Sequence, residues 1–247
     1  MSTIVIGDVH GDLKFLIDLV KIYPKQTNFV QLGDFGVGFP RINFDESLKY
    51  LDDNLHAMQS NMYVVRGNHD DPSYFEGQHM HRNLKFVPDY KVIRIEGRQV
   101  LFVGGGISLD RTQRTPGVSW WIGEKAKFNE EKLSKVEKVD VIVSHTAPHF
   151  CHPVRINDFV RTWISYDPSL GHEMPQERQI MTMVYDYLTK DKGLKIPKWF
   201  YGHFHQNRLI QVKYGTQFKL LNVCEIVKLD AKADKEIKPE TTGEEVV

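Results

Sequence analysis

The chain has 247 residues, a length that suits one large domain, or at most two, and that can bury a full hydrophobic core. Hydrophobic residues make up 41% of it and charged residues 26%, which is ordinary for a soluble globular protein. The 32 basic and 32 acidic residues give a net charge of zero, so overall charge does not indicate nucleic acid or a membrane as a partner, and only a local basic patch would.

No apolar stretch approaches the roughly 20 residues needed to span a bilayer. A strand pattern that starts at residue 3 leaves no room for a signal peptide. Cys151 and Cys224 are too few for a disulfide framework and are expected to be free thiols. We therefore expect a cytoplasmic protein with no membrane partner, whose oligomeric state the sequence leaves open.

Short apolar runs, rich in β-branched or aromatic residues, predict strands that are covered on both faces. These runs are 3–6, 29–32, 62–65, 139–143 and 198–201. Helical patterns separate the first three runs. Their apolar faces are Leu13, Leu16, Ile17 and Val20 in one helix, and Leu48, Leu51, Leu55 and Met58 in the next. The chain therefore begins with a βαβαβ unit, which predicts a parallel sheet with right-handed crossovers.

The middle of the chain is dominated by strand patterns. They lie at 85–87, 90–95 and 100–103, with turn residues between the last two. A short amphipathic pattern at 130–137 predicts a helix that leads into the strand at 139–143.

The remainder of the chain is less regular. Residues 146–175 show no sustained period, and a loop of this length inside a domain is typical of a lid or a substrate-binding loop. Helical spacing returns at 176–188, and the last strand pattern lies at 224–229. Mostly charged and small residues at 230–247 predict a flexible tail.

A short polar motif lies at or just beyond the end of each buried strand. The motif residues are Asp8, His10, Asp34, Asn68, His69, His145, His203 and His205. Ligands of open α/β sheets bind in the crevice outside the carboxyl ends of the strands. Such a series of motifs, each at a predicted strand end, is hard to explain as packing.

The spacing within two motifs indicates a metal site. Asp8 and His10 are two residues apart, as are His203 and His205, so each pair points the same way from an extended backbone. A carboxylate and an imidazole that converge make a mixed oxygen and nitrogen site, which suits a first-row divalent ion. Taken alone, Asp8 could be a helix N-cap, Asp34 a turn residue, and the histidines solvated side chains.

The motif around Asn68 is more specific. An amide oxygen can coordinate a metal, and an adjacent histidine can donate a proton. Because neighbouring side chains diverge, Asn68 can face an ion while His69 faces a substrate. His145, taken alone, would be a core or surface histidine.

Together these residues resemble the calcineurin-like metallophosphoesterase superfamily. Gly7–Gly11 and Arg66–Asp70 look like the serine/threonine-phosphatase type of its motifs, and the resemblance spans residues 4–205 in family order. It implies an α/β fold, a four-layer α/β/β/α sandwich with two mixed sheets, which we expect over residues 1–229 as one calcineurin-like phosphoesterase domain.

The resemblance also implies a centre of two divalent metal ions. By motif position, Asp8, His10 and His205 would hold the first ion, Asn68, His145 and His203 would hold the second, and Asp34 would bridge both. Manganese is our first choice. Mixed carboxylate, amide and imidazole ligands do not discriminate among manganese, iron and zinc, so iron and zinc are the alternatives.

Such a centre implies hydrolysis of a phosphate ester by a metal-activated water. His69 is the candidate general acid for the leaving oxygen. Arg66, placed as in the phosphatase-type motif, would contact a pair of phosphate oxygens, and its alternative is a surface arginine.

One departure from the phosphatase type affects this interpretation. Those relatives carry an Asp and an Arg where this chain has Val37 and Gly38. The Asp orients the catalytic histidine and the Arg adds a phosphate contact. The group that orients His69 is therefore open, and a strict protein-phosphatase assignment is weakened.

Two further groups of residues lie outside the motifs. His149, Cys151 and His152 follow His145, but their spacing fits no structural zinc site, which needs two separated ligand pairs. A second group follows the glycines at 104–106 and could line a substrate pocket or simply pack a loop. Its members are Asp110, Arg111, Arg114, Trp120 and Trp121.

The sequence therefore predicts a metal-dependent phosphoesterase that cleaves phosphate mono- or diesters of unknown identity. The first alternative is a nuclease or nucleotide phosphodiesterase, which would need a basic groove with exposed aromatics. The second is a non-catalytic protein-binding scaffold of the same fold. Such a scaffold should have lost His69 or several ligands, and this chain has kept them.

Overall fold

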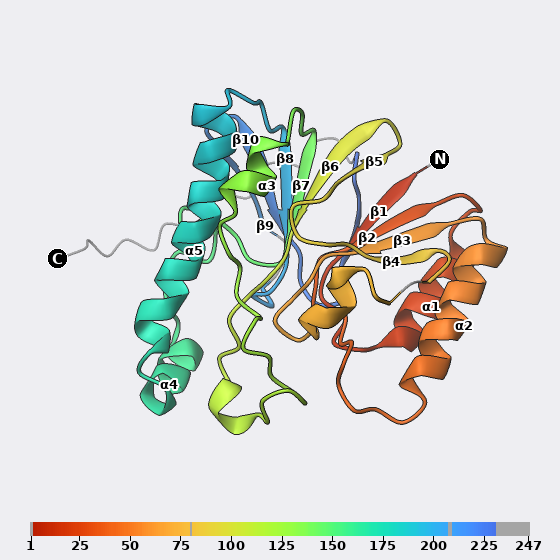
Figure 1. The fold of residues 1–247 in the computed structure, drawn as a ribbon, viewed down its shortest axis with the longest axis horizontal. Helices are drawn as coiled ribbons and strands as arrows, with labels where there is room; N and C mark the ends of the chain where they lie inside the picture. Colours follow the sequence, from red (N-terminus) through yellow and green to blue (C-terminus); the bar gives the residue numbers. More distant parts are fainter. Residues whose placement is uncertain (1, 80, 207–208, 231–247) are drawn as a thin grey trace.

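The computed structural model of the chain describes residues 2–79, 81–206 and 209–230, so all but the first residue of the predicted tail lies outside the described part. Two sheets lie face to face between two sets of helices (Figure 1). This arrangement is the four-layer α/β/β/α sandwich with two mixed sheets that the sequence predicts.

The first sheet is built from both ends of the chain. It contains β1 (Thr3–Ile6), β2 (Asn28–Gln31), β3 (Asn61–Val64), β4 (Leu84–Phe86) and β11 (Ile226–Lys228), in the order β11-β1-β2-β3-β4. Strands β1 to β4 are parallel, and β11 is antiparallel to β1. Helices α1 (Leu13–Ile22) and α2 (Phe44–Ala57) cover the outer face. The predicted βαβαβ unit is confirmed.

The second sheet comes from the middle and later parts of the chain. It contains β5 (Val92–Ile95), β6 (Arg98–Val103), β7 (Val141–Ser144), β8 (Lys198–Tyr201), β9 (Leu209–Lys213) and β10 (Thr216–Leu220), in the order β5-β6-β7-β8-β10-β9. The inner strands are parallel and the edge strands β5 and β9 antiparallel. Helices α3 (Glu130–Ser134) and α5 (Leu170–Asp186), with the π-helical turn η3 (Tyr187–Asp191), pack on the outer face.

Alternate side chains of each inner strand enter different cores. In β1, Ile4 and Ile6 pack on the helix side, whereas Val5 packs between the sheets. In β7, Ile142 packs on the helix side and Val143 between the sheets. Because both faces of these strands are buried, their sequences are continuous apolar runs rather than alternating patterns.

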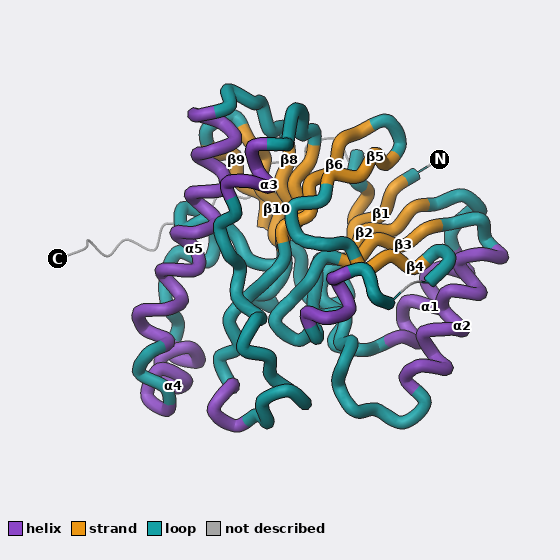
Figure 2. The backbone as a smooth tube through the Cα atoms, in the orientation of Figure 1, coloured by secondary structure: helices purple, strands orange, loops and turns teal. Residues whose placement is uncertain are grey.

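The structure differs from the prediction in the segment 146–175, which is partly helical (Figure 2). It contains α4 (Asp158–Tyr166) and the first turns of α5, which begins at Leu170 rather than at residue 176. The predicted helix at 130–137 ends at Ser134. Short 3-10 turns, η1 (Pro72–Glu76) and η2 (Arg111–Gln113), lie in the loops. No helix in the described part of the chain is long and apolar enough to cross a membrane.

Candidate metal centre

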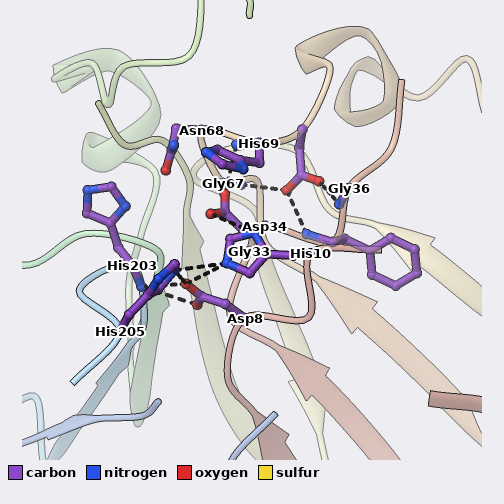
Figure 3. Close-up of polar contacts among 12 residues, drawn as sticks. Asp8, His10, Gly33, Asp34, Gly36, Gly67, Asn68, His69, His203 and His205 are labelled. Atoms are coloured by element: carbon purple, nitrogen blue, oxygen red, sulfur yellow. Dashed lines mark hydrogen bonds and ion pairs between the residues drawn. The ribbon is translucent and has the colours of Figure 1, made fainter. Parts of the chain in front are cut away.

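The predicted site residues converge at one edge of the sandwich (Figure 3). Asp8, Asp34 and Asn68 follow β1, β2 and β3 of the first sheet. His145 and His203 follow β7 and β8 of the second. The carboxyl ends of parallel strands from both sheets therefore meet at one place, as the position of the motifs predicts.

The interpretation of Asp8 as a helix N-cap is wrong. Asp12 caps α1, because its carboxylate accepts a hydrogen bond from the Phe15 backbone at 2.9 Å. The Asp8 carboxylate is buried and accepts from the backbone N–H of His203 at 3.1 Å. Asp8 thereby links the first sheet to the loop after β8.

The first cluster consists of Asp8, His10, Asp34 and His205, whose ligand atoms all lie within 4.8 Å of one another. His10 Nε2 is 2.8 Å from His205 Nε2, and His205 Nε2 is 3.2 Å from Asp8 Oδ2. His10 Nδ1 is 3.7 Å from Asp34 Oδ2. Two carboxylates and two imidazoles thus face one small volume.

The second cluster consists of Asp34, His145 and His203, and Asn68 adjoins it. His145 Nε2 lies 3.1 Å from Asp34 Oδ1 and 3.0 Å from Asn68 Oδ1. The other ring nitrogen of His145, Nδ1, lies 2.7 Å from the carbonyl oxygen of Leu32. That contact fixes the ring so that Nε2 faces the cluster.

Glycines let the backbone approach these ligands closely. A Cβ atom at Gly106 would lie 2.9 Å from Asn68 Oδ1 and 2.9 Å from a ring carbon of His145. A Cβ atom at Gly67 would lie 2.2 Å from an oxygen of Asp34. A side chain at either position would displace a candidate ligand.

Several candidate ligands have a left-handed backbone. The φ angles of His10, Asp34, His203 and His205 are 46°, 54°, 71° and 47°. For residues other than glycine this conformation costs on the order of 1–3 kcal/mol each, and it concentrates at functional sites. The surrounding contacts hold it in place, since the carbonyl of Asp34 accepts from the backbone of His10 at 2.7 Å.

Charges in the centre oppose the effect of burial on the pKa of Asp34 and of His145. Burial resists ionisation of Asp34, but His145 and His69 outweigh it and hold the pKa of Asp34 well below its usual range. Burial also resists protonation of His145, but Asp34 and Asp8 raise the pKa of His145 to about 10. Burial and His145 together lower the pKa of His203 well below its usual range.

This donor set fits a divalent metal ion. The carboxylates draw positive charge into a buried volume, and the neutral imidazole of His203 offers a lone pair, as a metal ligand must. The shared oxygen and nitrogen donors, with no thiolate among them, suit manganese, iron or zinc.

Asp70 is a supporting residue that the sequence interpretation missed. Its buried carboxylate accepts from the backbone N–H of Gly36 at 2.7 Å and of Gly67 at 2.8 Å. It therefore joins the loop that carries Asp34 to the loop that carries Asn68. Its position directly after the Asn-His pair was the available signal, but nothing local shows which backbone groups it would meet.

His69 lies at the border of the centre and belongs to neither cluster. Its backbone N–H donates to Asp34 Oδ1 at 2.8 Å, and its Nε2 lies 3.2 Å from Nη2 of Arg114. Arg114 is held in turn by Asp110, with Nε 2.6 Å from Oδ1 and Nη2 2.7 Å from Oδ2. The residues that orient His69 thus include a pair from the segment after β6, and the sequence left that segment's role open.

Aromatic side chains adjoin His69 on the same side. The Phe39 ring centroid lies 5.9 Å from that of His69 and 5.1 Å from that of Trp121. Arg114 lies over the Phe39 ring at 5.6 Å. Arg111 points elsewhere and donates to Asp167 and Glu173 at 2.7 and 2.6 Å, which ties the segment after β6 to the region of α4 and α5.

Arg66 is held by partners within the protein. The side chain is buried, and Nη1 donates to the backbone oxygens of Gly123 and Glu124 at 3.2 and 2.7 Å. Nη2 donates to Asp89 Oδ2 at 2.8 Å. This burial excludes the surface arginine that was its alternative, and the contact with phosphate oxygens stays a prediction.

The histidines and cysteine after His145 lie outside both candidate metal clusters found among the described residues. Cys151 is buried, and His149 Nδ1 lies 2.8 Å from the hydroxyl of Thr182. Burial raises the pKa of the Cys151 thiol, which disfavours the thiolate that a metal needs.

Comparison with known proteins identifies the family of the chain. A search of curated proteins gives no significant match. Two solved structures from Thermus thermophilus match the chain. TT1561 is 11% identical, with a TM-score of 0.48 over 91% of this chain and 91% of that chain. A 5'-nucleotidase precursor is 13% identical, with a TM-score of 0.42, and the match covers 91% of this chain but only 49% of that one. The family model of the calcineurin-like phosphoesterases matches residues 1–207, and the chain therefore belongs to that family.

Proposed function

We propose that the protein is a dinuclear metal-dependent phosphoesterase that hydrolyses phosphate mono- or diesters. The observation that carries the proposal is the position of Asp34 between the clusters. Its Oδ2 lies 3.7 Å from His10 Nδ1, and its Oδ1 lies 3.1 Å from His145 Nε2. One carboxylate thus offers an oxygen to each cluster, as a ligand between two adjacent ions would.

The proposed ligands divide into two sets around Asp34. The first set is Asp8, His10 and His205, and the second set is Asn68, His145 and His203. When bound, the ions would neutralise phosphoryl oxygens and activate water for attack on phosphorus. We propose manganese first, with iron or zinc as alternatives. The two free cysteines agree with a reducing, cytoplasmic location, which is also a proposal.

His69 is the proposed general acid. Its backbone N–H donates to Asp34, its ring nitrogen lies 3.2 Å from Arg114, and its ring packs edge-on against the His10 ring at 5.1 Å. A group in this position can donate a proton to the leaving oxygen while its neighbour Asn68 serves as a ligand.

The test combines metal content with activity. Metal-free protein would be reconstituted separately with Mn²⁺, Fe²⁺ and Zn²⁺, and its bound ions would be counted by elemental analysis. Hydrolysis of p-nitrophenyl phosphate and bis-p-nitrophenyl phosphate would then be compared. We expect two bound ions and hydrolysis of at least one ester. Protein that binds no ion and cleaves neither ester would contradict the proposal.

Nucleotides are the second candidate substrates, as a nuclease or nucleotide phosphodiesterase would use. The half-buried ring of Phe39 beside His69, with Arg114 over it, is the observation in favour, because a base can stack on an aromatic face. A panel of nucleotides and phosphopeptides, assayed with the reconstituted protein, would separate this candidate from a protein phosphatase. A protein-binding scaffold would hydrolyse none of them.

A further inference from the structure

A buried chain of hydrogen bonds leads from Asn68 away from the metal centre. Asn68 Nδ2 donates to Ser108 Oγ at 3.0 Å, and the Ser108 hydroxyl donates to Glu124 Oε2 at 2.6 Å. The Ser108 backbone N–H donates to the other Glu124 oxygen at 3.0 Å. Asn68, Ser108 and Glu124 are 3%, 1% and 0% exposed. The proposed function gives no role to Ser108 or Glu124.

We propose that Glu124, acting through Ser108, is a positioning residue that keeps the amide oxygen of Asn68 turned toward the metal centre. The inference rests on the proposed function, in which Asn68 is a ligand. An amide presents an oxygen on one side, which can coordinate an ion, and an NH₂ group on the other, which cannot. A half-turn of the amide exchanges them with little change in shape. In the structure, Oδ1 faces the centre and lies 3.0 Å from His145 Nε2.

The hydrogen bonds from Asn68 through Ser108 to Glu124 form a relay. The number of protons that each group can donate fixes the direction of these hydrogen bonds. A carboxylate only accepts hydrogen bonds, and a serine hydroxyl has a single proton to donate. Because the Ser108 hydroxyl donates its one hydrogen bond to Glu124, its oxygen can only accept a hydrogen bond from Asn68. Asn68 must then turn its NH₂ group toward Ser108 and its oxygen toward the ions.

The backbone of Glu124 is held by residues next to Asn68. Its backbone oxygen accepts from Arg66 Nη1 at 2.7 Å and from the backbone N–H of Gly106 at 3.1 Å. Gly106 in turn packs so closely on Asn68 that a Cβ atom there would lie 2.9 Å from Oδ1. Arg66 thus also holds the segment that orients Asn68.

Glu124→Gln tests the relay because it keeps the shape of the side chain and replaces one hydrogen-bond acceptor with a donor. The glutamine oxygen can still accept from the Ser108 backbone, but its NH₂ group then faces the hydroxyl and donates to it. The hydroxyl proton is driven toward Asn68, which favours the reversed amide. We expect the affinity for Mn²⁺ at the site of Asn68, His145 and His203 to fall about 10–100-fold, the usual effect of losing such a supporting partner. The site of Asp8, His10 and His205 should keep its affinity.

Equilibrium dialysis with Mn²⁺ would give the number and affinity of the sites, and anomalous scattering would show which site is depleted. Glu177→Gln is the matched control, because Glu177 is a buried carboxyl that interacts electrostatically with Glu124 and has no hydrogen bond to Ser108. Ser108→Ala breaks the relay without reversing it and should weaken the same site less. Thermal unfolding would establish that each variant is folded.

A measurement without metal separates this inference from the proposed function. In metal-free protein the side-chain NH₂ signals of Asn68, assigned by their loss in Asn68→Asp, should exchange slowly with water and shift in Glu124→Gln. Unchanged Mn²⁺ affinity in Glu124→Gln, or an equal loss in Glu177→Gln, would overturn the positioning role even if the unaltered protein binds two ions. If the unaltered protein binds no ion, the proposed function fails, and unchanged Asn68 signals in Glu124→Gln would then reject the relay itself.

Discussion

Asp34 contacts its neighbours through both its side chain and its backbone. Its carboxylate accepts from the His69 backbone at 2.8 Å, and its carbonyl accepts from the His10 backbone at 2.7 Å. Its left-handed φ of 54° brings side chain and carbonyl into the same centre. This one residue therefore lies next to ligand atoms of both clusters.

Removing charge from Asp34 should affect both metal sites together. Asp34→Asn leaves one side-chain oxygen, where Asp34 offers one oxygen to each cluster. We therefore expect the affinity of both sites for Mn²⁺ to fall, each by at least about tenfold. Asp8→Asn should weaken mainly the site of His10 and His205. Dialysis isotherms of the two variants would show the difference. Loss of a single site in Asp34→Asn would contradict the shared role.

His69→Ala should leave metal binding nearly intact and lower turnover by roughly 10²–10⁴, the usual share of a general acid. The loss should be smaller for p-nitrophenyl phosphate, whose leaving group departs readily without a proton, than for an alkyl phosphate. His172→Ala, at an exposed position on α5, is the control. Equal losses on both substrates would instead assign His69 to charge stabilisation or to ordering the centre.

The residues of the centre were largely predictable, but their supports were not. Asp8, His10 and Asp34 follow strands directly, so local pattern was sufficient to find them. The partners of Arg66 were not predicted because they lie 23 to 59 positions away in the sequence. Asp70 and the Asp110 side chain were unassigned for the same reason, since a hydrogen bond between loops leaves no periodic trace.

At the scale of elements, the loop after β3 is held from two sides. Asp70 joins it to the loop after β2, and Arg66 joins it to residues 123–125. Both contacts are buried, and they fix the backbone from which Asn68 and His69 project.

Arg66→Ala should therefore destabilise the fold. It leaves buried carbonyl groups and Asp89 without their partner, so we expect a loss of about 2–4 kcal/mol in the free energy of unfolding. Arg98→Ala, which removes a partly exposed ion pair with Asp230, should have little effect. Denaturant unfolding would measure both. Unchanged stability of Arg66→Ala with a large loss of turnover would instead support the predicted phosphate contact.

Helix α5 contains a carboxyl whose burial makes stability depend on pH. Burial and the nearby Glu124 raise the pKa of Glu177 from 4.5 to about 7, although His145 acts in the opposite direction. Below pH 4.5 the group is protonated whether the chain is folded or not. As pH rises toward 7, the unfolded chain releases the proton more readily, and folded stability falls.

Glu177→Gln should remove this penalty. The variant and the unaltered protein should be equally stable near pH 4.5. Above about pH 7 the variant should be more stable by up to about 3 kcal/mol, the value of a gap of about 2.5 pH units. Denaturant unfolding across this range would show a difference that grows with pH and then levels. A constant difference would contradict the raised pKa.

The helices that were missed show the limits of local patterns. Helix α4 has 9 residues and none of them is buried, so it lacks the buried apolar face that α1 and α2 have. Helix α5 contains Pro175, and a proline normally ends a helix, so its start was placed after that residue. The strands and α1 and α2 were found because each buries a regular apolar face.

At the scale of the molecule, the centre exists only where the two sheets meet. The contact between Asp8 and the His203 backbone joins residues 195 positions apart. Motifs from both sheets must therefore be packed before either cluster is complete. The order of motifs along the chain predicted this convergence, whereas distances between their atoms required the structure.

The most direct test of the account is anomalous scattering from crystals of the Mn²⁺-loaded protein. We expect two peaks about 3.5–4 Å apart, the usual separation in two-metal sites, with Asp34 between them. One peak should adjoin Asp8, His10 and His205, and the other should adjoin Asn68, His145 and His203. A single peak, or peaks that do not share Asp34, would contradict the dinuclear centre.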